Sequence, residues 1–131
     1  VWTGPGVYIP DMTHGYEDLD VPIARQWMTE APVRIGNGSW LGQGVVVLPG
    51  CTIGEHTVVG AKSVVAGDLP DRAIAVGIPA RVVRRHVPDL GWVNVDRDGK
   101  PVIDSNGARS SGDSGALPHG GGHHDLAEAP D

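Results

Sequence analysis

The sequence contains few of the residues that cross-link a chain, anchor it in a membrane or fill an aromatic core. Its 131 residues include one cysteine, no phenylalanine and only 5% aromatic side chains. A single cysteine excludes a disulfide within the chain, which favours a reducing compartment, and we therefore expect a cytoplasmic protein. No stretch approaches the roughly 20 apolar residues of a membrane-spanning helix, and no signal peptide is visible.

Basic residues are also scarce. Ten lysines and arginines stand against sixteen aspartates and glutamates, which gives a formal net charge of −6. This balance argues against a general nucleic-acid-binding surface. The only dense basic cluster is formed by Arg81, Arg84 and Arg85.

The C-terminal part has almost no large apolar residues. From Asn94 onward the chain is rich in Gly, Ser, Asp and Pro, and it carries most of the net negative charge. Such a segment cannot bury enough surface to offset the entropy lost on ordering, so we predict that residues 94–131 form a disordered tail. The histidines in this tail, His119, His123 and His124, indicate compositional bias rather than a metal site.

A six-residue period is the strongest pattern that is present. An aliphatic residue recurs every six positions, and a small or β-branched residue often follows it four positions later. Neither a helix, with period 3.6, nor a simple strand, with period 2, produces this spacing. The period predicts a β-solenoid with three flat faces per coil and stacked aliphatic columns inside. The recurring positions are Ile35, Leu41, Val47, Ile53, Val59 and Val65.

The hexads account for only part of a solenoid. Six hexads at three per coil make two coils, whereas about three repeats are usually needed for a stable core. The chain begins at Val1, and residues 4–9 already resemble a repeat. We therefore expect that upstream coils are missing, or that partner subunits complete the core.

The segments flanking the regular hexads have other roles. Residues 11–31 interrupt the period, and their acids and Pro22 predict a loop that projects from the solenoid. Residues 32–70 are the regular part, which ends in the turn sequence 68–71. Residues 72–87 alternate loosely, and we expect them to close the last coil and cover its exposed edge.

Four motifs in the order found here resemble the hexapeptide-repeat acyltransferases, in particular the maltose, galactoside and nodulation O-acetyltransferase branch. The resemblance covers about residues 7–86 and is specific as an ordered set, although any single hexad is weak evidence. The motifs are Gly36-Asn37-Gly38-Ser39-Trp40-Leu41-Gly42, Leu48-Pro49-Gly50-Cys51-Thr52-Ile53-Gly54, Val59-Gly60-Ala61-Lys62-Ser63-Val64-Val65 and Gly77-Ile78-Pro79-Ala80-Arg81-Val82-Val83.

The resemblance implies an all-β fold, a left-handed parallel β-helix over residues 1–93, and a homotrimer with active sites between subunits. It also implies transfer of an acetyl group from acetyl-CoA to a hydroxyl, usually of a sugar, with no metal, no nucleic-acid partner and no membrane span. The acceptor itself cannot be read from the residues present. A sugar, a polysaccharide, an antibiotic and a lipid-linked glycan all remain open.

His14, in Met12-Thr13-His14-Gly15-Tyr16, resembles the catalytic histidine of the family. A sugar hydroxyl is a poor nucleophile near neutral pH and needs a base, a task that suits histidine. We predict that His14 takes the hydroxyl proton as the oxygen attacks the thioester. The residues that could orient its ring are acids of the same segment: Asp11, Glu17, Asp18 and Asp20.

The resemblance also names residues for the acyl donor. Arg81 and Arg84 match positions that contact the nucleotide end of CoA, a role that suits guanidinium groups. Gln43, Ala61, Ala66 and Gly67 match positions along the pantetheine arm. Where the family often has Thr-Lys, this chain has Ala66-Gly67, so that contact is either lost or taken over by Lys62 or Arg85.

Trp40 matches an aromatic residue beside the family's active-site groove. It is a candidate for packing on the acceptor or the pantetheine, and equally for an apolar cap on a solenoid corner. Two other functions remain open for the whole chain. One is a catalytically silent scaffold, and the other is a metalloenzyme of the γ-carbonic-anhydrase type, which would need three histidines to meet.

Overall fold

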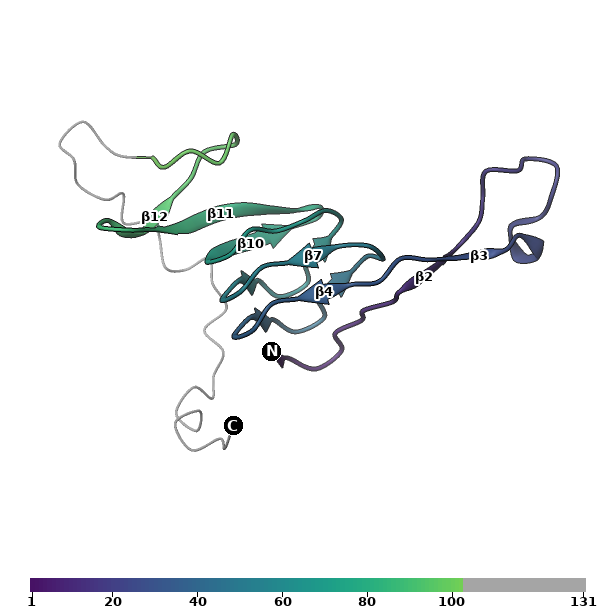
Figure 1. Cartoon of the computed structure of the whole chain (residues 1–131), viewed down its shortest axis with the longest axis horizontal. Coiled ribbons are helices and arrows are strands. Elements are labelled where there is room, and N and C mark those ends of the chain that lie inside the picture. Colours follow the sequence, from purple (N-terminus) through teal and green to yellow (C-terminus); the bar gives the residue numbers. More distant parts are fainter. Residues whose placement is uncertain (103–131) are drawn as a thin grey trace.

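The structure is a computed structural model that describes residues 1–102. Its central part is a three-sided prism of short strands, seen in Figure 1 as stacked coils. Each strand pairs in parallel with the strand three hexads later, as in Arg34 with Thr52 and Trp40 with Val58. The predicted coil of three hexads is confirmed. The strands are β4 (Arg34–Ile35), β5 (Trp40–Leu41), β6 (Val46–Val47), β7 (Thr52–Ile53), β8 (Val58–Val59) and β9 (Val64–Val65).

Two columns of side chains fill the prism. The aliphatic column from Leu41 to Val65 is at most 1% exposed, and Ile35 at its beginning is half-buried. Burial of each such side chain stabilises the fold by roughly 1.5–3 kcal/mol. The second column consists of the small or β-branched residues four positions later, which are at most 4% exposed: Ser39, Val45, Cys51, Thr57 and Ser63.

The buried hydroxyl groups of the second column hydrogen-bond successive coils together. Ser39 Oγ donates to the carbonyl of Gly54 at 2.7 Å and accepts from the amide of Thr57 at 3.0 Å. Thr57 Oγ1 donates to the carbonyl of Pro70 at 2.6 Å. Because the hydroxyl groups of Ser39 and Thr57 both have partners, these residues avoid the desolvation penalty of an unpaired group.

An additional partial coil precedes the hexads. β1 (Trp2–Thr3) pairs in parallel with β5, and Tyr8 bridges to Val46. Residues 1–9 therefore build two walls of this coil, and the chain then leaves the prism before it returns at β4. The left-handed sense of the coil stays a prediction from the resemblance.

The segment that leaves the prism is an arm rather than a simple loop. β2 (Met12–His14) and β3 (Met28–Glu30) pair antiparallel, and the 3-10 turn η1 (Ile23–Arg25) lies near the tip. Figure 1 shows this arm extending well away from the coils. Its place in the sequence agrees with the interruption predicted at 11–31, but its two-stranded pairing was not predicted.

A cap of three longer strands closes the other end of the prism. β10 (Ala73–Gly77) pairs in parallel with β8, and it is followed by two antiparallel strands, β11 (Ala80–Val87) and β12 (Gly91–Asn94). The wall of the prism that contains β1, β5 and β8, which we call the first wall, thus becomes part of a six-stranded sheet. The strand order of this sheet is β1-β5-β8-β10-β11-β12. The cap covers the edge of β8, as predicted for residues 72–87.

Regular structure continues beyond the boundary predicted at residue 93. Val95 bridges to Pro101, and Asp96 Oδ1 accepts hydrogen bonds from the amides of Asp98 and Lys100 at 2.9 Å. The amide of Val95 donates to the carbonyl of Val83 of β11 at 3.0 Å, and the amide of Val102 donates to the carbonyl of Asn94 at 2.8 Å, so this segment pairs with the cap. The domain boundary at residue 93 stays a prediction. The remainder of the predicted tail, with its three histidines, lies outside the described residues. Within residues 1–102, no helix has the length and apolarity needed to cross a membrane.

Two glycines differ in the space around them, and we therefore expect their replacement by alanine to affect stability differently. A Cβ on Gly36 would lie 2.5 Å from the amide nitrogen of Glu55, whereas one on Gly67 would meet nothing within 4 Å. We expect Gly36→Ala to lower the free energy of unfolding by roughly 1–3 kcal/mol, the usual cost of overpacking. Gly67→Ala should leave it unchanged within about 1 kcal/mol. Urea titrations of both variants would measure this, and equal midpoints would contradict it.

Candidate active site

Two edges of the prism carry the residues that the sequence singled out. We call the first the arm edge, which consists of residues 48–50 and 66–68 that follow the paired strands β6 and β9. The arm returns here, because the amide of Gly50 donates to the carbonyl of Ala31 at 2.8 Å. We call the other the second edge, which consists of residues 43–44 and 61–62, where the amide of Lys62 donates to the carbonyl of Gln43 at 2.8 Å.

His14 is the last residue of β2 and is exposed on the arm, where it pairs with Met28 of β3. Two of the four acids considered as its partners are engaged elsewhere. Glu17 Oε2 accepts from the amide of Tyr16 at 2.9 Å, and Asp18 Oδ1 accepts from the amide of Asp20 at 2.9 Å. Within residues 1–102 the structure gives no hydrogen bond to the His14 ring.

Gln26 holds the tip of the arm together and was missed by sequence reasoning. Its Nε2 donates to the carbonyls of Asp18 and Val21, both at 2.8 Å, and its Oε1 accepts from the amide of Asp18 at 3.3 Å. One glutamine in an irregular segment gives no sequence signal for this role. The neighbouring Trp27 is 93% exposed and Leu19 is 95% exposed, so the tip presents apolar side chains to solvent.

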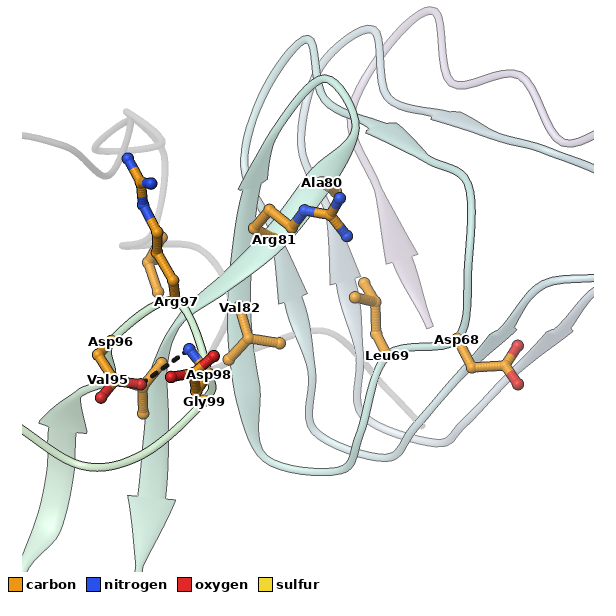
Figure 2. Close-up of a pocket in the computed structure, with 11 residues that line it drawn as sticks. Asp68, Leu69, Ala80, Arg81, Val82, Val95, Asp96, Arg97, Asp98 and Gly99 are labelled. Carbon is orange, nitrogen blue, oxygen red and sulfur yellow. Dashed lines mark hydrogen bonds between the residues drawn. The ribbon is translucent and has the colours of Figure 1, made fainter.

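A cavity of about 230 Å³ on the arm edge brings together three of the predicted donor residues. Ala66 and Gly67 form part of its wall, and Arg81 of β11 lies beside them together with the Pro79-Ala80 turn of the cap. The cavity continues into a larger one of about 660 Å³ beneath the cap, since Asp68, Leu69, Ala80 and Arg81 line both. Figure 2 shows the Arg81 side chain extending over the end of the prism.

Two other predicted donor residues lie elsewhere in the subunit. Gln43 is exposed and Ala61 half-buried, and both belong to the second edge. The Lys62 side chain lies over Gly44, where an added Cβ would come within 2.9 Å of Nζ. The chain therefore divides the predicted pantetheine contacts between two edges of the prism.

Arg84 has a different environment from Arg81. A bulge between Ile74 and Ala75 shifts the register, so Arg84 pairs with Ile74 while Arg81 pairs with Val76. Arg84 Nη2 donates to the carbonyl of Trp92 at 3.4 Å, and its Nε is buried without a partner among the described residues. Arg84 lines neither of the two cavities that contain Arg81. Its assignment to the donor site stays a prediction.

Trp40 lies on the first wall, away from the arm edge. Its ring stacks on that of Trp2, with centroids 6.0 Å apart and planes 28° apart. This neighbour was not singled out from the sequence, because residues 1–9 contain too little of the repeat to fix their register. Residues 1–102 hold no group of three or more His, Cys, Asp or Glu side chains placed to bind a metal ion.

Comparison with known proteins identifies the repeats. Residues 32–67 match the bacterial transferase hexapeptide (six repeats). A probable acetyltransferase of Mycobacterium tuberculosis is 46% identical over 85 residues, which cover 65% of this chain and 28% of that protein. The chain thus spans less than a third of the length of this curated relative.

Two solved structures share the fold. A maltose O-acetyltransferase of Clostridium difficile is 38% identical with a TM-score of 0.59, over 63% of this chain and 43% of that one. A hexapeptide-repeat acetyltransferase of Vibrio cholerae in complex with acetyl-CoA is 33% identical with a TM-score of 0.56, over 62% and 43% of the two chains.

Proposed function

Because this chain belongs to the hexapeptide-repeat acetyltransferase family, we propose that it transfers the acetyl group of acetyl-CoA to a hydroxyl group of a saccharide. One observation carries the proposal. The arm with His14 returns to the prism at the same edge as the cavity lined by Ala66, Gly67 and Arg81. A donor held along this edge would extend from the cap toward the arm. The relatives named above support this assignment, since one acts on maltose and one was solved with acetyl-CoA.

His14 is the general base in this proposal. Its neutral imidazole accepts the proton of the acceptor hydroxyl while the oxygen forms a bond to the thioester carbonyl carbon. The carbon–sulfur bond then breaks, and the imidazolium returns the proton to the departing thiolate. The exposed position of His14 leaves room for both substrates, and no metal is needed because the thioester is already activated.

Arg81 binds a donor phosphate in this proposal. Arg81→Ala should raise the dissociation constant of CoA about tenfold or more, because a hydrogen bond to a charged group contributes roughly 1.5–3 kcal/mol. Arg34→Ala is the matched control, since Arg34 is exposed on β4 and lines neither cavity. Isothermal titration with CoA measures both variants. An unchanged affinity in Arg81→Ala would remove this residue from the donor site.

We further propose that three subunits associate, so that the arm edge of one faces the second edge of its neighbour. The division of the predicted donor residues between two edges supports this arrangement, as does the apolar tip of the arm with Leu19 and Trp27. Light scattering coupled to size exclusion should give three times the chain mass. A monomer that retains full activity would contradict the shared site.

The direct test is turnover. The protein is incubated with acetyl-CoA and a panel of mono- and oligosaccharides, and acetylated products are identified by mass spectrometry. Saccharide-dependent CoA release supports the proposal. Binding of CoA without transfer to any hydroxyl acceptor would favour the scaffold alternative, and absence of CoA binding would contradict a donor site altogether.

A further inference from the structure

The arm has a cavity of its own, which we call the arm cavity and which shares no residue with the two cavities at the cap. Its volume is about 420 Å³, within the usual range for small-molecule sites. Gly15, which is buried, and Val21 and Gln26, which are half-buried, form part of its wall. Gln26 joins the two sides of the tip through its hydrogen bonds to Asp18 and Val21, so the chain itself holds this concave shape.

The arm cavity lies on the face of the arm opposite to His14. Side chains alternate between the two faces of a strand, and His14 pairs with Met28 in the antiparallel arm. Thr29, the neighbour of Met28, lines the cavity, whereas neither His14 nor Met28 does. Gly15 and Trp27 line it as well, and the amide of Gly15 donates to the carbonyl of Trp27 at 3.0 Å. The two strands of the arm thus separate this cavity from the proposed base.

Three charged side chains line the arm cavity without forming an ion pair with one another. Glu17 Oε2 and Asp18 Oδ1 each accept one backbone amide, and their second oxygens have no hydrogen bond among residues 1–102. In the same described part of the chain, the Arg25 guanidinium has neither a hydrogen bond nor an ion pair. Trp27, which is almost fully exposed, adds an apolar ring at the rim.

We propose that the arm cavity binds a neutral saccharide unit of the acceptor, separate from the unit that is acetylated. A hydroxyl group both donates and accepts hydrogen bonds, so a sugar can join carboxylates, which only accept, to a guanidinium, which only donates. The C–H face of a pyranose ring fits against the indole ring of Trp27. Two carboxylates beside one guanidinium disfavour an anionic ligand, because like charges repel.

The inference rests on the proposed function for the reaction, but not for the binding. Because the arm lies between the cavity and His14, one sugar ring cannot occupy both faces. The acceptor is therefore a chain of several units, of which one is held by Arg25 and another is presented to His14. The arm cavity thus selects a glycan chain over a single sugar.

The first test measures binding in the absence of acetyl-CoA. The full chain is titrated calorimetrically with neutral gluco- and galacto-hexasaccharides. Arg25→Ala should weaken the binding of these chains about tenfold or more, because a hydrogen bond to a charged group is lost. Arg34→Ala is the matched control, since Arg34 is exposed on β4 and does not line the arm cavity. Equal affinities of the two variants, or no binding of either hexasaccharide, would overturn the inference.

Turnover separates this inference from the proposed function. The ratio of kcat/KM for the hexasaccharides to that for glucose and galactose should fall about tenfold in Arg25→Ala and stay constant in Arg34→Ala. If sugars are acetylated and Arg25→Ala leaves this ratio unchanged, the inference is wrong and the proposed function stands. If the hexasaccharides bind through Arg25 but no hydroxyl is acetylated, the binding site stands and the proposed function fails.

The assembly state provides a second check on the occupant of the arm cavity. Light scattering should give the same mass for Arg25→Ala and Trp27→Ala as for the unchanged protein, while both variants lose affinity for the hexasaccharides. A lower mass in Arg25→Ala would show that a neighbouring chain occupies the cavity, and it would overturn the inference.

Discussion

Replacing His14 by asparagine should abolish measurable acetyl transfer while the affinity for CoA stays unchanged. General-base catalysis contributes about 10²–10⁴-fold to the rate, and asparagine cannot accept the hydroxyl proton. His14 is exposed at the end of β2, so the substitution removes no packing from the core. Initial rates at saturating acetyl-CoA give the loss in kcat, and isothermal titration gives the affinity for CoA.

His56→Asn is the matched control for this experiment. His56 is exposed at a corner of the prism between Glu55 and Thr57, far along the chain from the arm, and its φ of 49° is a conformation that asparagine tolerates. The control should retain the activity of the unchanged protein. If His14→Asn keeps its rate as well, another group takes the proton and the base assignment is wrong.

The walls of the prism could be predicted from the sequence because they follow from a local rule that repeats. Every sixth residue from Leu41 to Val65 must be apolar to fill the same column, and the buried Ser39, Thr57 and Ser63 satisfy the second column through hydrogen bonds. A pattern that recurs this often is insensitive to any single exception. Leu48 and Ala66 follow the paired strands β6 and β9 at the arm edge, where the register between the two strands is regular.

The distribution of the site residues could not be predicted in the same way. Gln43 and Ala61 are one coil of three hexads apart, so the period itself places them on one edge and Ala66 and Gly67 on another. No period reaches Arg81 of the cap, so its position beside Ala66 and Gly67 could not be predicted from the spacing. The register shift in the cap places Arg84 opposite Ile74, and a bulge has no periodic signal. Likewise, the pairing of residues 94–102 depends on one turn held by Asp96, which composition alone assigned to a tail.

The proposed chemistry lies on the arm, which interrupts the repeat. The coils on either side of the arm fix its position. The arm leaves the prism between two walls of the first partial coil and returns at Ala31, whose carbonyl is bound by Gly50. Any loosening of the coils would therefore change the position of His14 relative to the donor edge. The stability of the core and the geometry of the proposed site are therefore coupled through the contact between Ala31 and Gly50.

Replacing a buried side chain of the core should have a large effect on the stability of the fold. Leu41 is 0% exposed in β5, between Thr3 of the preceding coil and Val59 of the following one. Leu41→Ala should lower the free energy of unfolding by about 2–5 kcal/mol, because the lost apolar contacts and the resulting cavity both destabilise the prism. Urea unfolding followed by tryptophan fluorescence measures the change, since Trp40 is the adjacent residue.

Leu48→Ala is the control with the same chemical change at a different burial. Leu48 is 38% exposed at the arm edge, and its backbone amide donates to the carbonyl of Val65 at 2.9 Å, a bond that does not involve the side chain. We expect its free energy of unfolding to change by less than about 1 kcal/mol, close to the effect of an ordinary surface substitution. Equal losses in the two variants would show that the aliphatic column does not carry the stability of the fold. A loss confined to Leu41→Ala would locate that stability in the repeating hexads that support the arm.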